Sequence, residues 1–194
     1  GFWLYKKGKN AVLTIRKIHR SFKGVCLNPK SKLSDEQCKK LAVGAMYASQ
    51  QGAYQNSIET GISDLLPKIL GEWWGIESTD AAKEELDYLC EKGYRYYFPF
   101  VYQAFLLGKP EAQDEIFQQN MTSQEDYDKI VAQFQNLQET FDELIRCKVV
   151  AEKEELLHYG VAGWDAGRIC FLARACCEMG YITEAEAWKY IDLA

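Results

Sequence analysis

The chain has 194 residues, of which 47% are hydrophobic and 26% charged, and its formal net charge is −5. A chain of this size and composition can form one globular domain whose core is stable without disulfides or metal ions. No low-complexity tract, internal repeat or complete membrane-spanning segment is visible, which excludes fibrous, repeat and membrane-spanning architectures for the sequence as given.

The first 34 residues are strongly basic. They hold nine lysine or arginine residues and no acid, whereas the other 160 residues hold 14 basic and 28 acidic side chains. Aromatic residues stand directly beside lysines at the start of the chain, as is typical of the cytoplasmic face of a membrane. An anchoring segment in the inner membrane, preceding Phe2, would fit this position. The residues predicted to be membrane-proximal are Phe2, Trp3, Tyr5, Lys6, Lys7 and Lys9.

A basic amphipathic helix is predicted next, with Asn10 as its N-cap and an apolar stripe from Ala11 to Phe22. Such a helix can lie on an anionic membrane surface, or it can pack its stripe on the domain with its charges facing the acidic body. Both alternatives stay open. Nucleic acid is disfavoured as a partner, because the negative body opposes phosphate. We therefore predict a basic arm over residues 1–32 and a helical domain over residues 33–194.

The body is predicted to be all-α, with about eight helices. Capping boxes predict helices that begin at Ser34, after Thr122 and at Thr183. The clearest helix follows Thr122, where apolar residues recur every three or four positions. A helix is expected to open at Pro99 and to end at Gly108. The segment YRYYFPF is the best strand candidate, although Pro99 weakens it.

Residues 163–191 are predicted to form two helices joined by a tight turn, and the first carries two charges among residues that otherwise favour burial. Asp165 falls near the start of this helix, where the helix dipole favours a carboxylate, and Arg168 follows on the same face. Because an arginine buried alone is costly, we predict a structural ion pair between them. An anion-binding spot at the helix N-terminus is the alternative. On the opposite face, Arg174 and Glu178 are expected to pair in solvent.

The motifs of the common enzyme classes are missing. No zinc-binding H-E-x-x-H, phosphate-binding glycine loop, dinucleotide fingerprint or G-x-S-x-G elbow occurs. Glu155-x-x-His158 has the spacing of a di-iron helix, but that chemistry needs a second such motif. We predict no catalytic residue, no metal and no cofactor, and only a Cys–His pair formed in the fold stays open. The seven cysteines form no C-x-x-C pair and are interpreted as free thiols in a reducing compartment.

Two segments carry a resemblance to a known family. One is WWGIESTDAAKEELDYLCEKGYR, from Trp73 to Arg95. The other is made of Trp164, Asp165, Gly167 and Arg168, then Arg174, Gly180, Tyr181, Ile182, Glu184, Ala187 and Trp188. Together they resemble the bacterial domain-of-unknown-function family 1266, the YbeU/YbeR-like proteins, over roughly residues 33–191. The resemblance implies a mostly helical bacterial protein and supplies no established activity.

Two functions are compatible with these features. The favoured one is a non-enzymatic helical interaction module that binds an unidentified protein partner, in the cytoplasm or at the cytoplasmic membrane face. The alternative is a small-ligand or anion-binding protein, or an enzyme, whose site lies where the two segments meet in a solvent-open pocket. A buried Arg168 fully paired to Asp165 would exclude that alternative. The candidate site residues are Trp74, Arg95, Trp164, Asp165 and Arg168.

Overall fold

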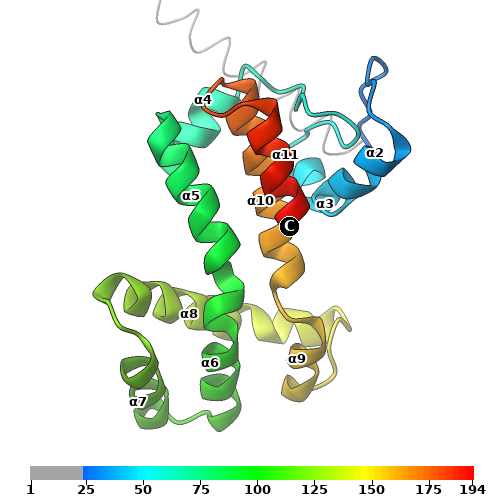
Figure 1. Cartoon of the computed structure of the whole chain (residues 1–194). Coiled ribbons are helices and arrows are strands. Elements are labelled where there is room, and N and C mark those ends of the chain that lie inside the picture. The colour runs from blue at the N-terminus through cyan, green and yellow to red at the C-terminus, as the bar shows by residue number, and fades with distance from the viewer. Residues whose placement is uncertain (1–23) are drawn as a thin grey trace, which may run out of the picture. The chain divides into compact units, whose positions relative to one another are not determined.

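The computed structural model describes residues 24–194, and every regular element in that range is helical (Figure 1). Ten α-helical segments, α2 to α11, follow one another, so the all-α prediction is confirmed. The described residues form two compact units, one of residues 24–90 and 163–194 and the other of residues 91–162. Most of the predicted arm lies outside the described residues, so the expected boundary at residue 32 stays a prediction.

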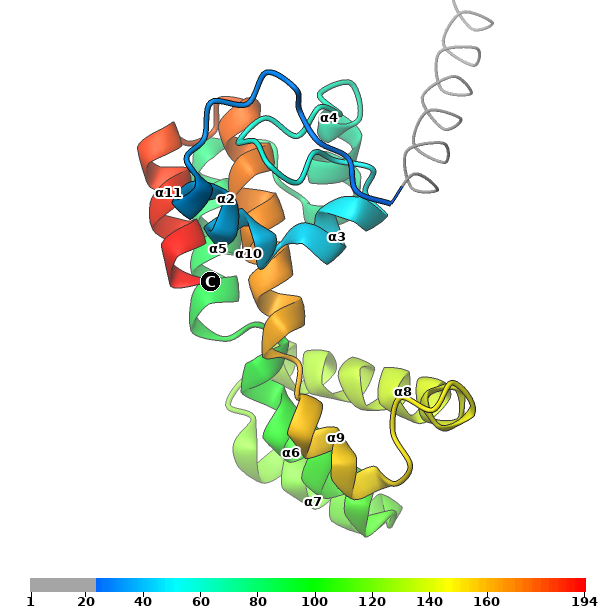
Figure 2. The same ribbon diagram turned by 90° about the vertical axis from the view of Figure 1, so that its right-hand side faces the viewer.

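Helix α10 is the centre of the first unit (Figures 1 and 2). Every residue of α10 from Asp165 to Cys176 is buried. A helix that neighbours cover on all sides carries apolar residues around its whole circumference, as the sequence here does. The elements of this unit are α2 (Asp35–Ala42), α3 (Ala45–Gln50), α4 (Leu66–Lys68), the π-helical turn η1 (Ile69–Trp73), α5 (Thr79–Glu91), α10 (Ala162–Glu178) and α11 (Glu184–Leu193).

Polar contacts tie the C-terminal helix α11 to two of its neighbours. The Tyr190 hydroxyl donates to Asp87 of α5 over 2.8 Å. Two ion pairs are added, Lys83 with Glu186 at 2.8 Å and Lys40 of α2 with Asp192 at 2.7 Å. These exposed pairs contribute little stability each, so they fix the position of α11 while its buried apolar face supplies most of the free energy.

The helix starts follow the local capping signals closely. The capping boxes of Ser34 with Gln37 and of Thr183 with Glu186 are both present. The box predicted at Thr122 is wrong by one residue. Ser123 is the N-cap of α8 and accepts the backbone N–H of Asp126 at 3.1 Å. The predicted box pairs Thr122 with Glu125, but Glu125 is exposed and Asp126 is buried. Burial of Asp126 therefore favours the register in which Ser123 is the N-cap.

The second unit is built around aromatic side chains. Edge-to-face ring pairs join its helices, with Phe105 and Phe141 centred 5.0 Å apart and Phe117 and Phe134 5.6 Å apart. Such pairs add about 0.5–1.5 kcal/mol each to the free energy gained from burial. The elements are α6 (Gly93–Leu107), α7 (Pro110–Asn120), α8 (Gln124–Arg146), the 3₁₀ turn η2 (Lys153–Glu155) and α9 (Leu156–Tyr159).

Two expectations about this unit are wrong. Pro99 does not open a helix but lies inside α6, and the strand candidate YRYYFPF is helical throughout. An internal proline costs about 3 kcal/mol. Burial of Tyr97 and Val101 on either side of Pro99, at 0% and 1% exposure, offsets that cost. Helix α7 was not predicted, although Pro110 stands at its first position.

Across residues 24–194, no helix combines the length and the apolar character needed to cross a membrane.

Candidate functional site

The predicted pair of Asp165 and Arg168 lies in the first turns of α10. Asp165 is fully buried and Arg168 is 8% exposed. A guanidinium N–H of Arg168 donates to Oδ1 of Asp165, as their three-residue spacing on one face predicts. The predicted structural ion pair is therefore present.

The glycine between these two charges has a packing role. A methyl group at Gly167 would lie 3.3 Å from Cβ of Tyr47, and one at Gly44 would lie 2.6 Å from Cβ of Cys170. Both glycines sit where the start of α3 meets α10. The Trp-Asp-x-Gly-Arg pattern thus combines a buried ion pair with a close approach of backbones, which is an architectural use of a glycine.

The two segments that carry the family resemblance meet within the first unit. The guanidinium carbon of Arg168 lies 6.0 Å from the centre of the Trp74 ring, within the range of a cation–π contact. Trp164 packs edge-on against Tyr47, with ring centres 5.2 Å apart. Arg95 belongs to α6 in the second unit, so the site described here contains the other four candidate residues.

This geometry disfavours an anion site at the pair. The buried guanidinium of Arg168 is engaged by Asp165, and the ring of Trp74 covers it. An incoming anion would have to displace a carboxylate that is itself fully buried, which would leave an uncompensated charge in the core. The contact between Asp165 and Arg168 therefore favours a structural role for this pair.

The expectation that Arg174 pairs with Glu178 in solvent is wrong, because Arg174 is buried and binds a loop. Arg174 is 2% exposed and forms no solvent-facing pair with Glu178. Its guanidinium donates to three backbone carbonyls of one loop, those of Tyr54 at 2.6 Å, Glu59 at 3.2 Å and Ile58 at 3.4 Å. Burial lowers the pKa of Arg174 to about 10, so the side chain keeps its charge at neutral pH.

Glu178 binds the same loop one turn later. Its Oε2 accepts both the backbone N–H and the hydroxyl of Thr60, each at 2.6 Å. Thr60 is fully buried. Two charged residues of α10 therefore hold one irregular segment, residues 54–60, by its backbone groups. Each satisfies groups that helix or sheet bonding cannot satisfy in such a loop.

The described stem of the basic arm is fixed to this loop in turn. The amide N–H of Asn28 donates to the side chain of Asn56 at 2.6 Å, and the Asn56 side chain donates back to the Asn28 carbonyl at 3.1 Å. The Gln55 N–H donates to the Cys26 carbonyl at 2.9 Å. The stem, residues 24–33, is thus hydrogen-bonded to loop residues of the same unit. The predicted membrane-proximal residues lie outside the described residues.

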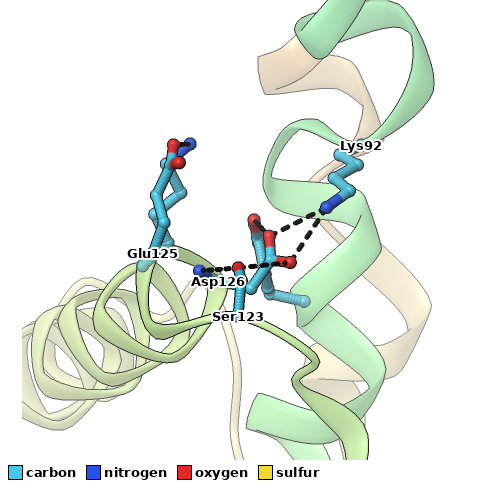
Figure 3. Close-up of polar contacts among 6 residues, drawn as sticks. Lys92, Ser123, Glu125 and Asp126 are labelled. Carbon is cyan, nitrogen blue, oxygen red and sulfur yellow. Dashed lines mark hydrogen bonds and ion pairs between the residues drawn. The ribbon is translucent and has the colours of Figure 1, made fainter.

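A charged cluster in the second unit was not anticipated from the sequence (Figure 3). Asp126 at the start of α8 accepts Lys92 Nζ at 2.9 Å and the Tyr97 hydroxyl at 2.7 Å, and its carboxylate also meets Ser123 at 3.1 Å. Burial raises the pKa of Asp126, but these hydrogen bonds outweigh it and leave that pKa below its ordinary value. The Ser123-x-x-Asp126 spacing could have predicted the contact between these two residues. No sequence pattern indicates the contacts of Asp126 with Lys92 and Tyr97.

We expect Asp126→Asn to lower the free energy of unfolding by about 1–3 kcal/mol at neutral pH, because the variant loses charged hydrogen bonds at a buried site. The lowered pKa of Asp126 means that its contribution is complete above the unfolded value of about 3.9 and is lost as the pH falls through the folded value. Urea titrations at neutral and at acidic pH should show the difference between parent and variant shrinking in acid.

Asp128→Asn is the matched control for this prediction. Asp128 lies on the same helix, is exposed and accepts a local hydrogen bond from Gln124 at 2.8 Å. Its replacement should change stability by less than about 0.5 kcal/mol at either pH. Equal losses in the two variants would contradict a specific role for Asp126.

Burial lowers the reactivity of two cysteines of α10. All seven cysteines are free thiols. Burial raises the pKa of Cys170 to about 11 and that of Cys176 to about 12, so both are protonated and poorly nucleophilic at neutral pH. Glu155, the carboxylate of the Glu155-x-x-His158 spacing, accepts the Ala151 N–H at 2.6 Å. Within residues 24–194, no group of three or more His, Cys, Asp or Glu side chains is placed to hold a metal ion.

These features define an all-α protein whose conspicuous buried charges bind its own backbone and side chains. A family model described as "Protein of unknown function (DUF1266)" matches residues 69–194. Since this is more than half of the chain, the protein belongs to the DUF1266 family, and the resemblance predicted from its two motif segments is confirmed. No curated protein and no solved structure matches the chain.

Proposed function

We propose that this protein is a non-enzymatic helical interaction module whose basic arm meets an anionic lipid surface at the cytoplasmic face of a membrane, while its helical body is presented to a protein partner. The observation that carries this proposal is the separation of charge along the chain. Nine basic and no acidic residues lie in the first 34 positions, and all 28 acidic side chains lie in the rest.

The contacts of the described stem of the arm, residues 24–33, support this proposal. Its described stem is hydrogen-bonded to the loop that Arg174 and Glu178 hold. Lys30 and Lys32 are exposed on that stem. Each basic residue near an anionic membrane contributes about 1 kcal/mol, so an arm of this charge binds well even when few of its residues reach the surface. Repulsion of the acidic body is screened over about 8 Å at physiological ionic strength.

The buried charges of the body support a non-enzymatic role. Arg168 is engaged by Asp165, Arg174 by loop carbonyls, and Asp126 by Lys92 and Tyr97. Each of these groups stabilises the fold through contacts that a substrate would have to break. This arrangement favours a body that presents a surface over one that performs chemistry.

The lipid proposal predicts that the full chain co-sediments with vesicles of phosphatidylcholine and phosphatidylserine, but not with vesicles of phosphatidylcholine alone. Replacing Lys6, Lys7 and Lys9 by glutamine should weaken the binding about 100-fold, because three surface charges are removed. Binding should also fall as the salt concentration rises.

A triple replacement in the body, of Lys39, Lys68 and Lys189 by glutamine, is the control, since these lysines are exposed and lie outside the arm. It should leave vesicle binding unchanged. If the parent protein fails to bind the anionic vesicles at low salt, or if the control weakens binding as much as the arm variant does, the arm is not a lipid-binding element.

A further inference from the structure

The second unit contains a cavity that the proposed function does not use. Its volume is about 250 Å³, and it lies between the end of α6, the start of α7 and one face of α8. Ala104, Phe105 and Phe134 give it an apolar wall, and all three side chains are buried. Pockets for drug-sized ligands span roughly 300–1,000 Å³, so this one suits a single small ring system.

The charge of the cavity is positive. Lys109 and Lys153 line it, and none of its lining residues carries a carboxylate. Lys153 is held in place, because its Nζ lies 4.6 Å from the centre of the Phe105 ring and donates to the Phe105 carbonyl at 3.4 Å. The ammonium group of Lys153 can therefore form an ion pair with a ligand, while the aromatic side chains of the cavity can pack against a ring of the ligand.

The start of α7 adds to this polarity. Pro110 is the first residue of this 11-residue helix, and Lys109 provides no side-chain cap. Lys109, Pro110 and Gln113 all line the cavity, so the positive end of the helix dipole lies beside the lysines. The amides of Gln113 and Gln138 supply neutral hydrogen-bonding groups at the same place.

We propose that this cavity binds a small aromatic carboxylate. Its carboxylate lies between Lys109 and Lys153, and its ring packs against Phe105 and Phe134. Inorganic anions would leave the apolar wall empty, and a neutral aromatic compound would leave the two ammonium groups without a counter-charge. The combination of a flat apolar body and one negative charge uses both halves of the cavity.

Three probes with the same ring test this assignment: indole-3-acetate, the neutral indole-3-acetamide and the cationic tryptamine. Titrations of the full chain, followed by ¹H–¹⁵N NMR, should give saturable shifts at residues of the cavity with the carboxylate. The amide should bind about five- to tenfold more weakly and the amine more weakly still, because the favourable charge contact is removed and then reversed. Equal affinity for all three, or no saturable shift with the carboxylate, overturns the proposal.

Variants separate the charge from the cavity itself. Lys109→Gln and Lys153→Gln should each weaken indole-3-acetate about two- to fivefold, as expected for a partly exposed ion pair, and leave the amide unaffected. Gln138→Trp, at an exposed position of α8, should fill the space and weaken both probes at least about tenfold.

Lys148→Asn is the matched control for the two lysines. Lys148 is exposed in the same unit, lies outside the cavity and has a positive φ of 57°, which asparagine tolerates. It should bind the carboxylate as the parent does. If Lys148→Asn weakens binding as much as Lys153→Gln, the attraction comes from overall charge and the assigned site is wrong.

Discussion

Arg174→Met is expected to lower the free energy of unfolding by about 3–5 kcal/mol, which is a large part of the stability of a small protein. Methionine fills a similar volume but donates nothing to the carbonyls of Tyr54, Ile58 and Glu59, which the buried guanidinium now satisfies. Hydrogen bonds to charged groups contribute about 1.5–3 kcal/mol each when buried. Urea unfolding followed by circular dichroism measures the loss.

Amide hydrogen exchange locates the effect of this substitution. Residues 54–60 should lose protection first, because the loop is held through its backbone and not through a large apolar side chain. Arg174→Lys should fall between parent and methionine, since a lysine keeps the charge but not the planar fork of donors. Arg146→Met is the control, an exposed arginine paired with Glu143 at 3.0 Å, and should cost less than about 1 kcal/mol. An Arg174→Met protein as stable as this control would refute the role given to Arg174.

The Asp165–Arg168 pair is expected to behave as a structural unit. Asp165→Asn and Arg168→Met should each lower the free energy of unfolding by about 3–5 kcal/mol, because each leaves one buried charge without its partner. The double variant should lose about 1–3 kcal/mol less than the sum of the single losses, since no charge is then stranded. Thermal and urea unfolding of the three variants measure this coupling.

An exposed pair of the same unit provides the comparison. Lys40 and Asp192 are 2.7 Å apart with about half of their side chains exposed, at 40% and 49%. The corresponding cycle of Lys40→Gln and Asp192→Asn should give a coupling below about 1 kcal/mol. If the buried cycle shows no more coupling than this, or if Asp165→Asn unfolds at the parent's urea midpoint, the pair does not lock the start of α10.

The sequence by itself determined the features that depend on neighbours along the chain. Ser34 and Thr183 start their helices because each side chain meets a backbone N–H three residues later, a contact that needs no tertiary partner. The pairing of Asp165 with Arg168 follows from the same helical spacing. The all-α class and the family relationship rest on such local patterns as well.

The tertiary structure alone decided the features that depend on distant partners. Arg174 and Glu178 have the spacing of a solvent-exposed pair, yet a loop more than 100 residues earlier in the chain covers them and binds both. Asp126 accepts a hydrogen bond from Lys92, which lies just before α6 and 34 residues earlier in the chain, and burial keeps Pro99 inside α6 despite the cost of a proline there. Local sequence patterns favour particular backbone conformations. The free energy of burying a charge or an aromatic ring depends instead on the groups that pack against it, and the spacing of residues in the sequence does not identify those groups.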